Sequence, residues 1–246
     1  EKHSREQAER ARAALSTAGV SVGFAALLVG ALVGWVNGVI IVRFGQPAFI
    51  ITLGMQYILS GIALLWTGGL AVSGMNAEFK ALGQTYLFDT IPVPILYALI
   101  IGAAGYIILN RSKFGRSIAA IGGNPETAYL AGIPVVRRRI LVYVAVGLFS
   151  AFTGVIWAAR FASGIPGAGD GVNLKIMAAV IIGGTSPSGG SGTIVGTAIG
   201  CILLATITNF LILVGIPSTA QTLIFGLILI LSMFIDKYRR AVLSGK

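Results

Sequence analysis

The sequence predicts an all-α protein: a polytopic membrane helix bundle with about seven crossings, one of them short and broken by a Gly-rich turn. Hydrophobic residues make up 56% of the chain and charged residues 11%, whereas an ordinary soluble domain has about 25% charged residues. The mean hydropathy is +0.90, and the ionisable residues gather between long uncharged runs. The residues that give the net charge of +10 therefore lie mainly in the loops and the terminal segments. Without a basic helix interleaved with aromatic residues, it does not indicate nucleic-acid binding.

The first segment, residues 1–19, is polar and rich in helix-forming residues. It lacks the apolar core of a signal peptide. Because the chain begins at Glu1 and not at methionine, we expect a further N-terminal portion to precede it. We place the membrane region at residues 20–235 and a polar tail at residues 236–246.

Uncharged runs long enough for a membrane-crossing helix, about 20 residues, place the first four crossings. Arg43 ends the first run, and Pro92 and Pro94 fall in the first turn of the third, where a missing amide hydrogen is tolerated. The four crossings are expected at residues 20–42, 47–67, 91–110 and 140–159.

The apolar stretch between Lys175 and Asp236 is divided by two segments rich in glycine, proline and serine, which do not fit inside a straight helix. The helices left between them are expected at residues 176–182 (or from Gly171), 193–214 and 220–235. The first is too short to cross alone, so we expect a broken crossing whose Gly-rich turn lies at membrane depth, surrounded by protein or water. The dividing segments are GGTSPSGGSG (residues 183–192) and GIPST (residues 215–219).

Lysine and arginine collect in cytoplasmic loops, and two parts of this chain are basic. We expect both the 111–139 loop and the C-terminus to be cytoplasmic, which requires an even number of crossings between them. Counting the crossings back from the 111–139 loop places Glu1 outside the cell, although its segment is slightly basic. A second broken crossing after Arg43 would place Glu1 in the cytoplasm instead. In the 111–139 loop, one acidic residue, Glu126, stands beside the basic residues Arg111, Lys113, Arg116, Arg137, Arg138 and Arg139. In the tail, one acidic residue, Asp236, stands beside Lys237, Arg239, Arg240 and Lys246.

Ionisable side chains are nearly absent from the expected crossings. The only histidine, His3, lies in the polar first segment, no carboxylate falls inside a crossing, and Cys201 is the only cysteine. Paired-carboxylate, Ser-His and metal-assisted mechanisms lack their residues. We therefore expect no catalytic residue, no metal site and no cofactor in this chain. A proton or sodium relay lacks its titratable groups as well.

Two interpretations apply to the 34 glycines and to the neutral polar residues. Small residues let apolar helices approach closely in lipid, which we favour for Gly30, Gly34, Gly38, Gly196 and Gly200. For the cluster at residues 183–192 we favour a functional break. Polar residues in the crossings either face a pathway or satisfy a neighbouring backbone group. The pathway candidates are Asn37, Thr52, Gln56, Tyr57, Gly183, Gly184, Thr185, Ser186, Asn209 and Gln221.

A short capped helix is expected inside the basic 111–139 loop, over residues 125–131 of GGNPETAYLAGIP. Asn124 is a strong N-cap, Pro125 suits the first helical position, and Glu126 complements the dipole in the first turn. Gly132 supplies a left-handed terminator, and Pro134 stops the helix from continuing. The helix presents Tyr129 and Leu130 on the cytoplasmic face. It is either anchored to anionic lipid by the flanking basic residues or docks as a rigid knob into a soluble partner.

Several segments carry a resemblance to a known family. They are FGRSIAAIGGNPETAYLAGI, AAVIIGGTSPSGGSGTIVGTAIG, the positions Asn209, Gln221 and Asp236, and, more weakly, GWVNGVIIVRFGQPAFIITLGM. Together they resemble the permease subunits of bacterial ATP-binding-cassette monosaccharide importers, of the ribose, xylose, arabinose and galactose type in the branched-chain permease superfamily. The family's N-terminal spanning segments and Gly-Ile-Asp-Leu-Ser-Val-Gly-like motif are absent. Asn173-Leu174-Lys175 stands where a glutamate-leucine pair is common.

The resemblance implies a multi-pass permease of the bacterial inner membrane that forms the pathway for a small sugar. Its implied partners are a second protomer, identical or different, cytoplasmic ATP-binding subunits that hydrolyse ATP, and an external solute-binding protein. Alternatives are a permease for branched-chain amino acids or another small polar solute, an ATP-independent facilitator, and a non-transporting scaffold. The capped helix would be the coupling helix in a groove of the ATP-binding subunit, formed by Asn124, Pro125, Glu126, Thr127, Ala128, Tyr129, Leu130, Ala131 and Gly132.

Overall fold

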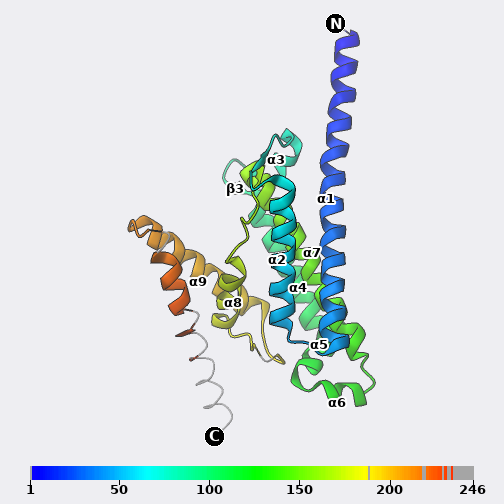
Figure 1. Cartoon of the computed structure of the whole chain (residues 1–246), viewed down its shortest axis with the longest axis vertical. Helices are drawn as coiled ribbons and strands as arrows, with labels where there is room; N and C mark the ends of the chain where they lie inside the picture. Colours follow the sequence, from blue (N-terminus) through cyan, green and yellow to red (C-terminus); the bar gives the residue numbers. More distant parts are fainter. Residues whose placement is uncertain (1, 188, 218–219, 229, 232–233, 235–246) are drawn as a thin grey trace. The chain divides into compact units, whose positions relative to one another are not determined.

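The computed structural model describes residues 2–187, 189–217, 220–228, 230–231 and 234, and most of them are helical (Figure 1). The described residues contain five helices long and apolar enough to cross a membrane, in agreement with a membrane helix bundle. The count of about seven crossings stays a prediction, because the last one, at residues 220–235, lies partly outside the described residues. The five segments are Ser21–Phe44, Ala48–Thr67, Val93–Arg111, Val135–Phe161 and Ile194–Leu213.

One compact unit contains the chain up to Ile100 together with Val136–Ala168. Two antiparallel pairs of very short strands, which the sequence did not predict, join its loops: β1 with β4 and β2 with β3. The elements of this unit are α1 (Lys2–Phe44), α2 (Ala48–Thr67), β1 (Val72–Ser73), α3 (Ala77–Gln84), β2 (Tyr86–Leu87), β3 (Ile91–Pro92), the start of α4 (Val93–Arg111), most of α7 (Val135–Phe161) and β4 (Ser163–Gly164).

Glycines of α1 pack against α7, as predicted for Gly30, Gly34 and Gly38, and the two helices lie side by side (Figure 1). A Cβ atom added at Gly30 would lie 2.5 Å from the carbonyl oxygen of Gly147, and one at Gly38 would lie 3.2 Å from the Cα of Ile140. A Cβ at Gly34 would meet the carbonyl oxygen of Tyr143. The helix backbones are therefore too close for larger residues at these positions.

The second compact unit contains Ile101–Val135 and the described residues from Gly169 onward. Ala178 and Ala179 of α8 and Leu204 of α9 form its buried core, which Phe225 flanks. A Cβ at Gly196 would meet the carbonyl oxygen of Gly183, and one at Gly200 that of Ala179, which confirms the packing role predicted for both glycines. The elements are the rest of α4, α5 (Lys113–Gly123), α6 (Pro125–Leu130), α8 (Val172–Ile182), α9 (Ile194–Leu213) and helical residues at 220–228.

Helix limits differ from the predicted ones where charge or proline served as the boundary. α1 begins at Lys2 and includes the polar first segment, because that segment is rich in helix formers and the single glycine before residue 20, Gly19, weakens a helix without ending it as proline would. α7 begins at Val135, so its first turns include Arg137, Arg138 and Arg139, whose long side chains let a helix extend beyond the hydrocarbon region. α4 begins at Val93, so Pro92 lies in β3 and not in the helix. The predicted tail, residues 236–246, lies outside the described residues.

Candidate functional site

The start of α6 is capped as the sequence predicts. The Asn124 side-chain oxygen Oδ1 accepts hydrogen bonds from the backbone amides of Glu126 at 3.0 Å and Thr127 at 3.1 Å. Pro125 is the first helical residue, where its missing amide hydrogen costs nothing. Two of the amide groups that a helix leaves unpaired at its N-terminus are thereby satisfied.

The end of α6 is also closed by its own backbone. Gly132 has a φ of 80°, the left-handed conformation that glycine adopts without strain. The amide of Gly132 donates to the carbonyl of Tyr129 at 2.9 Å, and that of Ile133 donates to Ala128 at 3.1 Å. This pair of bonds is a Schellman motif. The helix ends at Leu130, one residue earlier than predicted, with Ala131 as its C-cap.

The residues before Asn124 form a helix, α5, where we expected only a loop. The Ser112 hydroxyl oxygen caps it by accepting from the amide of Gly115 at 3.1 Å. Gly115, Ser117 and Ile121 are buried, and Ser117 and Ile121, four positions apart, lie on the same side of the helix. The signal that could have revealed α5 was Ser112 followed by apolar residues at helical spacing, which is typical of an amphipathic helix.

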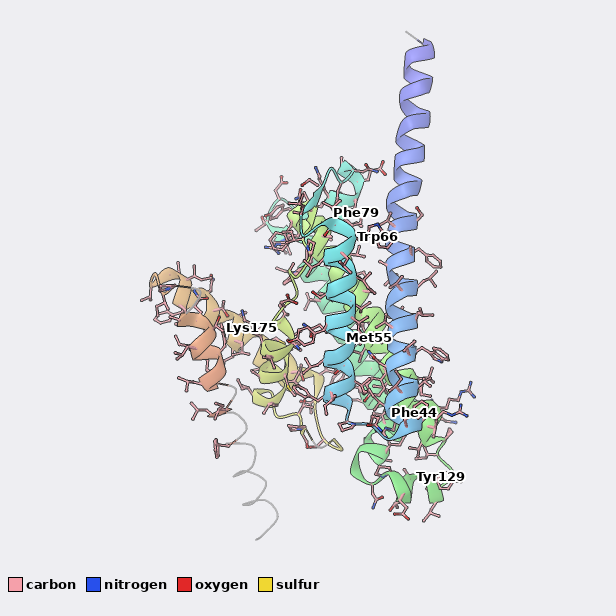
Figure 2. All side chains as sticks on the ribbon, viewed as in Figure 1. Phe44, Met55, Trp66, Phe79, Tyr129 and Lys175 are labelled. Atoms are coloured by element: carbon pink, nitrogen blue, oxygen red, sulfur yellow. The ribbon has the colours of Figure 1, made fainter. Side chains whose placement is uncertain are left out.

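The two sides of α6 differ sharply in exposure. Tyr129 and Leu130 are 70% and 80% exposed, and Tyr129 extends from the outer side of the helix (Figure 2). Ala128, which the sequence placed among the docking residues, is only 4% exposed. The exposed surface of α6 therefore consists of Tyr129 and Leu130 with their polar neighbours, and Ala128 packs beneath it.

The segment after α8 is a non-helical break, as predicted. Gly183 ends α8, and Gly184 has a φ of 85°. The amide of Ser186 donates to the carbonyl of Ser191 at 2.9 Å, which folds the described part of the segment into a loop. Pro187 and the glycines after it are exposed within this chain. A position at membrane depth stays a prediction.

The pathway candidates are distributed over both compact units. In the first unit, the buried side-chain oxygen of Asn37 has no hydrogen-bond partner in the part of the chain that the structure describes, whereas the Thr52 hydroxyl donates to the carbonyl oxygen of Ala48 in its own helix, 2.9 Å away. Gln56 is half-buried on α2, and Tyr57 is 74% exposed.

In the second unit, the structure brings a residue of the break next to a residue of α9. The hydroxyl oxygens of Thr185 and Thr197 lie 3.3 Å apart. The Gln221 side-chain amide donates to the carbonyl of Ile216 at 2.9 Å, and Asn209 is exposed on α9. Within the described part of the chain, no group of three or more His, Cys, Asp or Glu residues could hold a metal ion.

Lys175, at the position where the sequence departs from the resembled family, lies in the first turn of α8. Its ammonium nitrogen Nζ is 4.7 Å from the centre of the Phe225 ring, within the range of a cation–π interaction. A positive charge at a helix N-terminus is unfavourable for the helix dipole. The aromatic ring gives the ammonium group a compensating partner.

Comparison with known proteins finds relatives along most of the chain. The ribose import permease protein of Bacillus subtilis (strain 168) is 36% identical over 207 residues, which are 83% of this chain and 64% of that protein. The L-arabinose ABC transporter permease protein of Azospirillum brasilense is 36% identical over 228 residues, 92% of this chain and 66% of that protein. The L-arabinose transport system permease protein of Escherichia coli (strain K12) is 39% identical over 205 residues, 83% of this chain and 62% of that protein.

The chain thus spans slightly less than two thirds of the length of these three relatives. No solved structure matches it. Residues 16–233 match the family described as branched-chain amino acid transport system / permease component. This match includes α6, the Gly-rich break and every described crossing helix, and the chain therefore belongs to that permease family.

Proposed function

We propose that this chain is a permease protomer of an ATP-driven importer and forms the translocation pathway for a small sugar. The observation that carries the proposal is its identity of 36% and 39% to permeases named for ribose and L-arabinose, over 83% of this chain. ATP is hydrolysed in a separate cytoplasmic subunit. An external solute-binding protein delivers the sugar, and a second protomer completes the pathway.

The α6 helix couples this protomer to the ATP-binding subunit. Its caps at both ends make it a rigid unit, and its two large apolar side chains, Tyr129 and Leu130, are 70% and 80% exposed. Aromatic and apolar side chains that fill a pocket supply most of the energy of a protein interface. The basic residues on both sides of α6 support a cytoplasmic position for it, and in this proposal the C-terminus is cytoplasmic too.

The pathway is lined by neutral polar groups. A sugar offers hydroxyl groups that donate and accept hydrogen bonds, and amide and hydroxyl side chains match them without the desolvation cost of a charge. Asn37 suits this role because its buried side-chain oxygen has no hydrogen-bond partner among the described residues. The other candidates are Thr52, Gln56, Gly183, Gly184, Thr185, Ser186, Asn209 and Gln221.

The test is uptake into vesicles that contain the full-length permease with its ATP-binding subunit and solute-binding protein. We expect labelled ribose or L-arabinose to accumulate only when ATP is present. Accumulation of leucine and not of a pentose would favour the branched-chain amino acid alternative, which the family description suggests. Equilibration of sugar without ATP would instead identify a facilitator and contradict the proposal.

A further inference from the structure

The Gly-rich break touches the helix that leads into α6. A Cβ atom added at Gly122, near the end of α5, would meet the amide nitrogen of Gly190 and lie 3.0 Å from its Cα. A Cβ at Gly189 would lie 3.2 Å from the carbonyl oxygen of Gly122. These residues belong to the same compact unit. Two backbone segments that are distant in sequence therefore meet with no side chain between them.

Both sides of this contact depend on glycine. Gly189 and Gly190 have φ values of 90° and 81°, which other residues adopt only with strain. Gly122 has an ordinary helical position, so only the approach of Gly190 excludes a side chain there. Its neighbour Gly123 has no atom within 4 Å of an added Cβ.

The break is tied firmly to the helices on both sides of it. The amide of Thr185 donates to the carbonyl of Val180 in α8 at 3.1 Å, and its hydroxyl oxygen lies 3.3 Å from that of Thr197 in α9. A Cβ at Gly192 would lie 2.7 Å from the Thr185 Cγ2 methyl. These contacts connect the glycine tip of the break, Gly189 and Gly190, to α8 and α9.

On the other side, Gly122 is connected to α6 without any intervening loop. The amide of Asn124 donates to the carbonyl of Ala120 at 3.1 Å and ends α5. The side chain of the same asparagine caps α6. Asn124 therefore connects α6 directly to the end of α5, which the break contacts at Gly122.

We propose that the Gly122–Gly190 contact transmits movement between α6 and the broken crossing, so that Gly122 and Gly190 are positioning residues for transport. This rests on the proposed function, in which α6 docks on the ATP-binding subunit. It adds the route by which that docking reaches the pathway: from α6 to the end of α5, through the glycine tip, to α8 and α9. Contact alone does not establish such coupling, so the route needs a direct test.

The test compares Gly122→Ala with Gly123→Ala. Both changes add one methyl group at the end of α5, and both favour the helix by the same propensity. Only the methyl group at residue 122 collides with the break. A difference between the two variants therefore reports on the contact and not on the stability of α5.

The first measurement is hydrogen exchange of the backbone amides at residues 184–192 in the purified permease alone. We expect faster exchange in Gly122→Ala than in the wild type and in Gly123→Ala, because the added methyl group displaces the tip. Equal exchange in the two variants would overturn the contact itself, whatever the protein transports.

The second measurement is the number of sugar molecules imported per ATP hydrolysed by the complete reconstituted transporter. We expect about a tenfold loss in Gly122→Ala, a typical effect of one overpacked contact, with normal recovery of the ATP-binding subunit and wild-type behaviour in Gly123→Ala. An unchanged ratio in Gly122→Ala would overturn the proposal. Loss of ATP-binding subunit from Gly122→Ala would also overturn it, because the contact would then only shape the docking surface.

Failure of the proposed function would look different. The wild-type transporter would itself show no ATP-dependent sugar import, before any variant is compared, and the coupling route would fall with it. A wild type that imports sugar, together with a Gly122→Ala variant that matches it, would reject the route and leave the proposed function intact.

Discussion

Residues Ala128 and Leu130 lie close together on a six-residue helix, yet they have opposite surroundings. Ala128 is 4% exposed and Leu130 is 80% exposed. A large residue at 128 must displace packed neighbours, which costs about 1–3 kcal/mol or more. A substitution at 130 changes only the exposed surface. A substitution at Leu130 therefore tests docking. A substitution at Ala128 tests whether α6 stays packed against its neighbours.

We predict that Leu130→Arg abolishes recovery of the ATP-binding subunit on affinity purification while membrane abundance stays at the wild-type level. The substitution replaces an apolar contact with a charge, and loss of a residue that is a hot spot of an interface costs about 2 kcal/mol or more, close to thirtyfold in affinity. The lipid-anchor interpretation predicts the reverse, because an added arginine gains about 1 kcal/mol of attraction to anionic lipid. Full recovery of the ATP-binding subunit with Leu130→Arg would contradict docking and favour the lipid-anchor interpretation of α6. Ala128→Arg, the matched control, should lower abundance instead.

Pairs of helices in this chain approach each other through glycine. In α1 the glycines that face α7 recur at a spacing of four residues, at positions 30, 34 and 38, so they lie on one side of the helix. The same spacing recurs in α9, where Gly196 and Gly200 face α8. In lipid there is no hydrophobic gain from burying one apolar helix against another, so close backbone packing has to supply the attraction.

We predict that Gly34→Leu destabilises the protein and that Gly23→Leu, in the same helix, does not. A Cβ at Gly34 would meet the carbonyl oxygen of Tyr143, while one at Gly23 has no atom within 4 Å. The expected cost at residue 34 is about 1–3 kcal/mol. The melting temperature in detergent is the measurement, and equal melting temperatures for the two variants would show that α1 and α7 do not pack in this way.

At the scale of the whole chain, orientation in the membrane follows from charge. The segment from Arg111 to Arg139 holds basic residues on both sides of α6, against one acid, Glu126. The loop between α2 and α4 carries Lys80 against Glu78 and Asp89. Because basic loops are retained in the cytoplasm, we predict that α6 lies inside and the α2–α4 loop outside.

We predict that a cysteine at Glu126 reacts with a membrane-impermeant maleimide only from the cytoplasmic side, and one at Asp89 only from the outside. Both variants carry Cys201→Ser, because Cys201 is exposed in this chain and is its only cysteine. Labelling is measured on intact cells and on inverted vesicles. Reaction of both cysteines from one side would contradict the expected orientation.

Both ends of α6 could be predicted closely from the sequence because the residues that start and stop this helix act locally. Asn124, Pro125 and Gly132 act within a few residues of their own positions, through capping bonds and a left-handed backbone. The limits of α2 and α9 were also close, since proline, glycine and threonine border apolar runs there. Glycine spacing in α1 and α9 predicted close packing, because small residues on one side of an apolar helix have few other uses.

Other features were decided by parts of the chain that meet only in the folded protein. Ala128 is buried beneath α6 although nothing in NPETAYL separates it from its exposed neighbours. α5 is stabilised by burial of residues such as Ile121 against the rest of the protein. The basic charge of residues 111–139 indicated only a loop there. The approach of Gly190 to Gly122 joins segments almost seventy residues apart. Sequence patterns describe the preferences of one segment, but burial and contact depend on the opposing surface, which tertiary packing alone supplies.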